Sequence, residues 1–390
     1  METRRCLWSL LRNATLMVSL FAMYVTEAAG AHDCDGNGVF DEIEIAGKVY
    51  WSDYGSEMIK RADLDGANDE NLVDLGMNSG LEGIAVDTTA GKVYWTDQGT
   101  HKIQRSNFDG TVVEDLVTVG LSAPYEIALD VAAGKMYWTD NSTKKVQRAN
   151  LDGSDVEDLV TTGLGLPEGI DLDLTAGKIY WIDNGTTKIH RSDLDGTDVE
   201  DLVTTGISQP VGLALDVAAG KMYWTDWGSD KIQRANLDGS GVEDLVTTGL
   251  DHPVGIALDL VGGKMYWADS DNDVIQRANL DGSNVETIVN AGANDPEFIA
   301  VAQPRPDADN DGLLDACDEC PNDPDKTALG VCGCGVPDDD ADSNGTIDCQ
   351  EQAPADPSGC GCGSGIDGIA LFPMTLMGIG WMRRRRGKGE

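Results

Sequence analysis

Cysteine is missing from the middle of this chain. Nine cysteines occur among 390 residues, but none lies between Cys34 and Cys317, and seven of the nine follow residue 316. A domain in the cysteine-free interval must therefore be held by burial and strand pairing without disulfides, which a segment of this length can do.

Basic residues and histidines are also scarce. Lys and Arg number 28 against 68 Asp and Glu, which gives a formal net charge of −40. This balance argues against nucleic acid as a partner, because phosphate binding needs a basic surface, and it favours cation binding or plain solubility. The four histidines (His32, His101, His190 and His252) are scattered, and the repeat region has no Gly-x-Ser-x-Gly or phosphate-binding loop.

A short aromatic motif recurs six times in the interval without cysteine. It begins with Tyr-Trp and ends in Asp, at residues 50–53, 94–97, 137–140, 180–183, 223–226 and 266–269, with spacings of 44, 43, 43, 43 and 43 residues. A fixed period in this range is typical of repeat architectures.

One repeat, residues 220–262, predicts four short strands and no helix. Residues 221–226, 231–235 and 242–247 alternate or are rich in aromatic and β-branched residues, and the mostly apolar residues 255–259 indicate a buried fourth strand. Asp238-Gly239 is typical of a tight turn between strands. Four antiparallel strands in each repeat predict a blade of a β-propeller.

The apolar strand also occurs six times, and its last copy follows the last motif, at residues 298–301. If this strand pairs with the first motif strand, the two ends of the domain share one blade, and the exposed edge of an open sheet disappears. We therefore predict an all-β, six-bladed ring over residues 47–304, closed by pairing of its terminal strands.

The motifs resemble the YWTD (class B) repeats of the low-density-lipoprotein receptor family. Tyr-Trp-Thr-Asp-Trp-Gly at residues 223–228 matches the fuller consensus, whereas Ser52, Ile182 and Ala268 replace the threonine in other repeats. The resemblance covers about two-thirds of the chain. It implies a six-bladed propeller whose motif residues mostly hold the blades together and whose one face takes protein or peptide ligands.

Variable positions in the repeats predict where such a ligand binds. In propeller geometry the loops after the motif and before the apolar strand share one face, and exposed aromatic residues there are typical contact anchors. The predicted contact residues are Tyr54, Glu82, Tyr125, Glu168, Trp227, His252 and Glu297. A purely architectural surface-layer component is an alternative to a ligand-binding protein.

An enzymatic interpretation is the runner-up: a propeller hydrolase or lactonase with a metal over the central channel. Such a site needs unlike residues that converge from different blades. The apolar strands instead repeat alanine at one position (85, 128, 214, 257 and 300), with Asp171 as the exception. Asp171 is either a ligand or a satisfied polar group, and we favour the second. The prediction is a non-catalytic protein.

Three acidic loops match the calcium-loop pattern, with oxygen ligands at positions 1, 3, 5, 9 and 12, a carbonyl at 7 and glycine at 6. One lies in a segment at 32–46 and two in a cysteine-rich segment at 305–352, which resembles thrombospondin type 3 repeats and whose cysteines we expect to form disulfides. The predicted calcium ligands are Asp33, Asp35, Asn37, Val39, Asp41 and Glu44; Asp307, Asp309, Asp311, Leu313, Asp315 and Asp318; and Asp340, Asp342, Asn344, Thr346, Asp348 and Glu351.

Both ends of the chain predict export. Residues 1–31 have the arginines, apolar run and small residues of a secretory signal peptide. Residues 353–390 carry Cys360-Gly-Cys362, an apolar run at 369–382 and four arginines, which resembles bacterial C-terminal sorting signals; the alternative is a fortuitous hydrophobic tail. We expect a secreted or cell-surface protein that associates transiently with the membrane or cell envelope through this tail.

Overall fold

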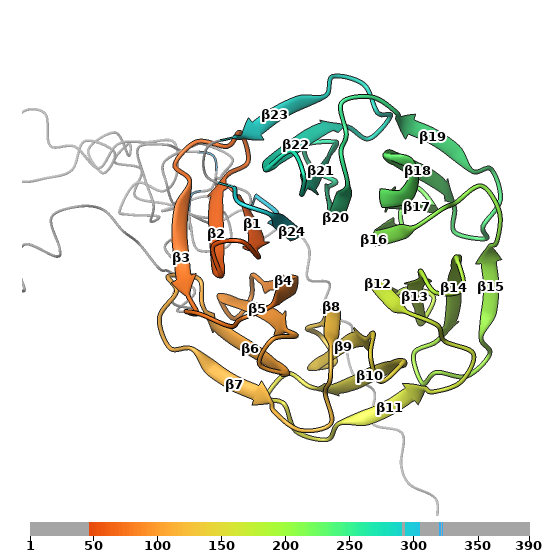
Figure 1. The fold of residues 1–390 in the computed structure, drawn as a ribbon, viewed down its shortest axis with the longest axis horizontal. Helices are drawn as coiled ribbons and strands as arrows, with labels where there is room; N and C mark the ends of the chain where they lie inside the picture. Colours follow the sequence, from red (N-terminus) through yellow and green to blue (C-terminus); the bar gives the residue numbers. More distant parts are fainter. Residues whose placement is uncertain (1–46, 291–292, 305–319, 321, 323–390) are drawn as a thin grey trace, which may run out of the picture. The chain divides into compact units, whose positions relative to one another are not determined.

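The computed structural model describes residues 47–290, 293–304, 320 and 322. Residues 47–290 and 293–304 form six four-stranded antiparallel sheets arranged as the blades of a ring (Figure 1). The predicted all-β, six-bladed propeller is therefore confirmed. The predicted signal peptide, calcium loops and C-terminal tail lie outside the described residues, apart from Cys320 and Asn322 between the loops.

Each blade runs from an innermost strand at the channel to an outermost strand at the outer edge of the ring. Blade 1 contains β24 (Pro296–Ala302), β1 (Lys48–Asp53), β2 (Met58–Asp63) and β3 (Glu70–Asp74); blade 2 contains β4 (Leu81–Asp87), β5 (Lys92–Asp97), β6 (Lys102–Asn107) and β7 (Glu114–Val117). Blade 3 contains β8 (Pro124–Asp130), β9 (Lys135–Asp140), β10 (Lys145–Asn150) and β11 (Glu157–Val160); blade 4 contains β12 (Pro167–Asp173), β13 (Lys178–Asp183), β14 (Lys188–Asp193) and β15 (Glu200–Val203). Blade 5 contains β16 (Pro210–Asp216), β17 (Lys221–Asp226), the 3-10 turn η1 (Trp227–Ser229), β18 (Lys231–Asn236) and β19 (Glu243–Val246); blade 6 contains β20 (Pro253–Asp259), β21 (Lys264–Asp269), β22 (Val274–Asn279) and β23 (Glu286–Val289).

The ring is closed by the two ends of the domain, as predicted. Strand β24 pairs antiparallel with β1, and Trp51 lies opposite Ile299. On its two sides β24 contacts β20 and β4, the inner strands of the neighbouring blades. Blade 1 is therefore complete only when the last strand of the domain joins the first three.

The Tyr-Trp pair recurs because the motif strand is buried on both faces. Successive side chains of a strand point to opposite faces, so the tyrosine of one blade and the tryptophan of the next share one apolar core. Tyr180 packs with Trp224, for example, and the last pair, Tyr266 with Trp51, closes the circle. The tryptophans of all six motifs are fully buried.

Arginines on the third strand of each blade, counted from the channel, add a polar tie between blades. Arg277 Nη1 donates to the Leu64 carbonyl of blade 1 over 2.7 Å, which links the last blade to the first. The other five ties join Arg61 to Phe108, Arg105 to Leu151, Arg148 to Leu194, Arg191 to Leu237 and Arg234 to Leu280. These ties were not predicted from the sequence.

The motif aspartate fixes the loops at one end of each blade. Asp226 Oδ1 accepts hydrogen bonds from the backbone N–H of Ser229, after the motif, and from that of Gln209, before β16; both distances are 3.1 Å. The loop after the motif therefore lies beside the loop before the innermost strand. We call this end of the ring the motif face.

One further prediction touches the described part of the chain. Cys320 is disulfide-bonded, as expected for a cysteine of its segment. Within the described residues, the chain contains no helix with the length and hydrophobicity of a membrane span.

Candidate binding face and central channel

The second residue of each innermost strand lies at the channel on the motif face, and we call these six residues the channel mouth. They are Glu297, Glu82, Tyr125, Glu168, Val211 and Val254, in order from blade 1 to blade 6. The mouth therefore has an acidic part in blades 1, 2 and 4 and an apolar part in blades 5 and 6. The near-identical backbones of the repeats bring together side chains that differ between blades.

The pKa values of the three mouth glutamates are raised. Glu82 is only 4% exposed, and burial raises its pKa well above the ordinary range, with further contributions from the charges of Glu297 and Glu168. Burial likewise raises the pKa of Glu168 to about 8 and that of Glu297 to about 8, where the charge of Asp295 adds to the effect. Near neutral pH Glu168 and Glu297 hold protons that exposed carboxyls would lose.

Side-chain amides next to the motif donate hydrogen bonds to some, but not all, of the carboxyl oxygens at the mouth. Gln98, directly after the motif aspartate of blade 2, donates to Glu82 Oε1. Asn184, at the same position in blade 4, donates to Glu168 Oε1 over 3.3 Å. Glu82 Oε2 is buried without a hydrogen-bond partner among the described residues, so the mouth has unused capacity to accept a donor.

The apolar part of the mouth is a packed cluster. Val211, Val254 and Phe298, from three blades, belong to one buried core, and Tyr125 packs against it. The ring of Tyr125 meets Phe298 edge-on with 5.4 Å between centroids. Tyr125 is therefore only partly exposed, because Phe298, at a position that is glycine in four other blades, gives its ring a partner.

Three predicted contact residues remain accessible around the mouth. Tyr54 is 41% exposed and Trp227 39% exposed. The Trp227 ring meets His252 edge-on at 5.0 Å, and His252 Nδ1 lies 2.6 Å from Asp271 Oδ2. The structure thus separates the predicted set into an accessible aromatic rim and the more deeply placed mouth residues.

The described residues offer one group of three side chains within reach of a single metal ion: Asp230, Asp251 and His252. Asp230 Oδ1 accepts the His252 backbone N–H over 3.1 Å, and Asp273 Oδ1 accepts the equivalent N–H of Asp295 over 2.8 Å. This contact braces the loop in two successive blades. The group lies in the loops after the motif of blade 5 and before the innermost strand of blade 6, and none of its three residues lines the channel cavity described below.

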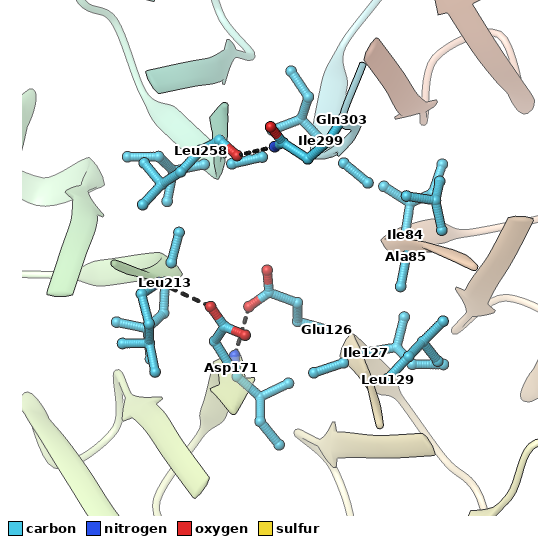
Figure 2. Close-up of a pocket in the computed structure, with 18 of the residues that line it drawn as sticks. Ile84, Ala85, Glu126, Ile127, Leu129, Asp171, Leu213, Leu258, Ile299 and Gln303 are labelled. Atoms are coloured by element: carbon cyan, nitrogen blue, oxygen red, sulfur yellow. Dashed lines mark hydrogen bonds between the residues drawn. The ribbon is translucent and has the colours of Figure 1, made fainter. Parts of the chain in front are cut away.

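Behind the mouth the central channel holds a cavity of about 410 Å³, lined mostly by Ile, Leu, Val and Ala of the innermost strands. Two carboxylates project into it from neighbouring blades, Glu126 and Asp171 (Figure 2). Asp171 accepts the backbone N–H of Leu172 over 2.7 Å and that of Leu215 over 2.8 Å, which supports our interpretation of a satisfied polar group.

Glu126 is a channel residue that the sequence reasoning missed. Four of the other five blades have glycine at this position (83, 169, 212 and 255), and blade 1 has Phe298. The break in that pattern was the available signal. Glu126 Oε2 accepts the Ile170 N–H at 2.5 Å, and burial raises its pKa well above the ordinary range, with the charge of Asp171 adding to the effect.

A solved structure of another protein shares this architecture. The ring resembles a chain in the crystal structure of a nidogen/laminin complex, with a TM-score of 0.61 and 24% identity over 66% of this chain and 99% of that chain. A structure of selenomethionine-substituted virginiamycin B lyase from Staphylococcus aureus gives a TM-score of 0.49 and 20% identity over 62% of this chain and 80% of that chain. No curated protein matches the sequence.

The family assignment comes from the sequence. A sequence model of the virginiamycin B lyase family matches residues 28–302, which include the complete ring. This match spans well over half of the chain. The protein therefore belongs to the virginiamycin B lyase family.

Proposed function

We propose that this protein is an exported, calcium-associated, non-catalytic propeller that binds a protein or peptide at the motif face and takes a lysine or arginine of that ligand at the acidic part of the channel mouth. The observation that carries the proposal is the convergence of Glu82, Glu168 and Glu297 on one mouth, where burial raises the pKa of all three carboxyls and repulsion from the other mouth glutamates adds to the rise for Glu82 and Glu297.

A basic side chain would stabilise the ionised form of the mouth glutamates. Three carboxyls that share a buried site repel one another when ionised, and a nearby positive charge favours their ionised form. An ammonium or guanidinium group also brings several N–H donors, and charge-assisted hydrogen bonds are the stronger kind. Glu82 Oε2 is available to accept one of them.

The accessible aromatic rim suits a macromolecular ligand. Trp227 and Tyr54 expose large rings without a charged group of their own, and tryptophan and tyrosine are enriched among the residues that dominate binding energies. Their position around the mouth allows one ligand to contact the rim and the glutamates together. The nidogen/laminin neighbour is a propeller-like fold in a protein complex, which is compatible with this use of the ring.

A matched pair of double variants tests the proposal. Glu168→Gln with Glu297→Gln removes two carboxyls from the mouth, whereas Glu157→Gln with Glu200→Gln removes two from outermost strands. Ligand is captured from native culture medium with each protein and identified by mass spectrometry. We expect the mouth variant to capture the wild-type ligand at least tenfold more weakly than wild type does, and the control variant to capture it as well as wild type does. Equal capture by the two variants contradicts the proposal.

The calcium and export parts of the proposal rest on sequence. Three loops with calcium-type spacing flank the ring, and the chain begins with a signal-type segment. Equilibrium dialysis against calcium, with and without chelator, tests the first part. N-terminal sequencing of the secreted protein tests the second, with cleavage near Ala31 as the expected result.

A lyase is the second candidate, favoured by the family assignment. Elimination needs a base that takes a proton and an acid that assists the leaving group, and groups with pKa values near the working pH serve best. Glu168 and Glu297, with pKa values of about 8, have suitable proton affinities. Chromatography of virginiamycin B incubated with the protein decides: loss of substrate that disappears with Glu168→Gln favours the enzyme over the binding protein.

A further inference from the structure

The cavity in the central channel has the properties of a small-molecule site. Its volume of about 410 Å³ lies within the range of roughly 300–1,000 Å³ that is typical of ligand pockets. Five of the six innermost strands present alanine to it, which leaves the space open (Ala85, Ala128, Ala214, Ala257 and Ala300). An apolar ligand body therefore has both room and matching walls.

The cavity is reached from the face opposite the motif face. Val131, Leu260 and Val261 line it and directly follow the ends of β8 and β20. They are exposed, Val261 at 75%. At the other end Val211, Val254, Phe298 and Tyr125 pack together at the mouth. A ligand that enters the channel is thus separate from one that binds the motif face.

A pair of carboxylates gives one wall of the cavity a negative character. Glu126 and Asp171 come from blades 3 and 4 and lie on the same side of the channel (Figure 2). Glu126 is 7% exposed. Its Oε2 atom accepts the Ile170 N–H, whereas its Oε1 atom accepts no hydrogen bond from the described residues. That oxygen is free to accept a donor from a ligand.

A structural role alone does not account for the charge. The tie to Ile170 uses one oxygen of Glu126, and a glutamine would supply the same acceptor without burying a carboxyl. Four blades have glycine at the Glu126 position and none of them needs such a tie. Burial disfavours the ionised form of the Glu126 carboxyl, and a bound cation would offset that penalty.

The surroundings decide which cation fits. Ca²⁺ takes six to eight oxygen ligands and Mg²⁺ six in octahedral geometry, but here two carboxylates face hydrocarbon walls. We propose that the central channel binds a small organic cation, a primary ammonium with an aliphatic or aromatic body, whose charged group lies at Glu126 and Asp171 and whose body lies against the alanines and isoleucines.

Three probes of equal chain length test the site in the full-length protein: n-hexylammonium, 1-hexanol and hexanoate, titrated by calorimetry. Hexylammonium should bind at least tenfold more tightly than hexanol, and hexanoate more weakly than hexanol. Its affinity should rise with pH, because protons compete for the Glu126 carboxyl at low pH, while the amine itself stays charged up to about pH 10.

Two variants separate charge from shape. Glu126→Gln keeps an acceptor for Ile170 and removes the charge, so hexylammonium affinity should fall at least tenfold and hexanol affinity should stay the same. Ala257→Phe fills the cavity from another wall and should weaken all probes. Thermal unfolding reports whether each variant is folded, and Asp171→Asn replaces Glu126→Gln if that variant is not.

These experiments test the channel site independently of the proposed binding at the motif face. Equal affinity for hexylammonium and hexanol, unchanged hexylammonium binding after loss of the charge, or no binding of any probe overturns the proposal. Capture of the macromolecular ligand should be unaffected by Ala257→Phe, so the channel site and the motif face can each fail without the other.

Discussion

At the scale of single residues, a hydroxyl at the third motif position ties two blades together in blades 1, 2, 3 and 5, while its neighbours vary. Thr225 Oγ1 accepts the Gly212 N–H over 2.9 Å in its own blade and donates to the Val254 carbonyl of the next blade. The motif threonine therefore links the innermost strands of two blades. The residue after the motif is free of this duty, and in blades 2 and 4 it supplies amides to the mouth glutamates.

Thr225→Val removes the hydroxyl and keeps the shape of the side chain. The Gly212 N–H and the Val254 carbonyl then lose a partner inside the protein, which costs about 1–3 kcal/mol for a buried polar group. Urea unfolding should show this decrease in the free energy of unfolding. Thr204→Val, an exposed substitution after β15, should change stability by less than about 0.5 kcal/mol; equal effects of the two variants would contradict the assigned role.

The raised pKa values of the mouth predict how stability depends on pH. The folded protein binds protons at Glu168 and Glu297 up to pH about 8, whereas unfolded glutamate has a pKa of about 4.3. Their contribution is fully present below the unfolded pKa and is lost as pH rises through about 8. Denaturant unfolding should show that Glu168→Gln flattens the fall between these limits.

Glu157→Gln is the matched control for that pH profile. Glu157 is on β11, the outermost strand of blade 3, and its hydrogen bond with Arg148 lowers the pKa of its carboxyl. Removing it should leave the fall in stability between about pH 5 and 8 in place. A Glu168→Gln profile that parallels wild type would refute the electrostatic description of the mouth.

At the scale of elements, β24 is the strand on which the ring depends. It pairs with β1 and contacts the inner strands of blades 2 and 6. Without it β1 becomes an exposed edge, and the core shared by Tyr266 and Trp51 loses Ile299. Edge strands of this kind are sites of aggregation.

Truncation tests this dependence. A chain that ends at Asn290 lacks β24, whereas one that ends at Pro304 keeps it. We expect the shorter chain to aggregate and to lose a single cooperative unfolding transition, and the longer chain to remain a folded monomer by light scattering. The same melting temperature for both chains would show that closure adds nothing to stability.

At the scale of the whole molecule, the period of the motif was enough to predict the number of blades, their strands and the pairing of the ends, because local alternation and the 43-residue spacing both reflect a repeated unit. The contents of the channel were harder to predict. Glu126 and Phe298 matter because six strands converge there, and convergence across blades is not a property of any one repeat. Trp227 is exposed, as the sequence predicted. Tyr125 was also expected to be exposed, but its ring packs against Phe298 of another blade, and one repeat does not reveal such a contact.

The mouth combines side chains from blades 1, 2 and 4, so its proposed activity depends on the complete ring. A double-mutant cycle tests this claim most directly. Each lysine and arginine of the captured ligand is changed to glutamine and paired with Glu168→Gln, and binding is measured by calorimetry. We predict one basic residue whose coupling energy with Glu168 is about 1.5 kcal/mol or more, as for close charge pairs across interfaces. Additive effects for every pair would contradict capture of a basic side chain by the mouth.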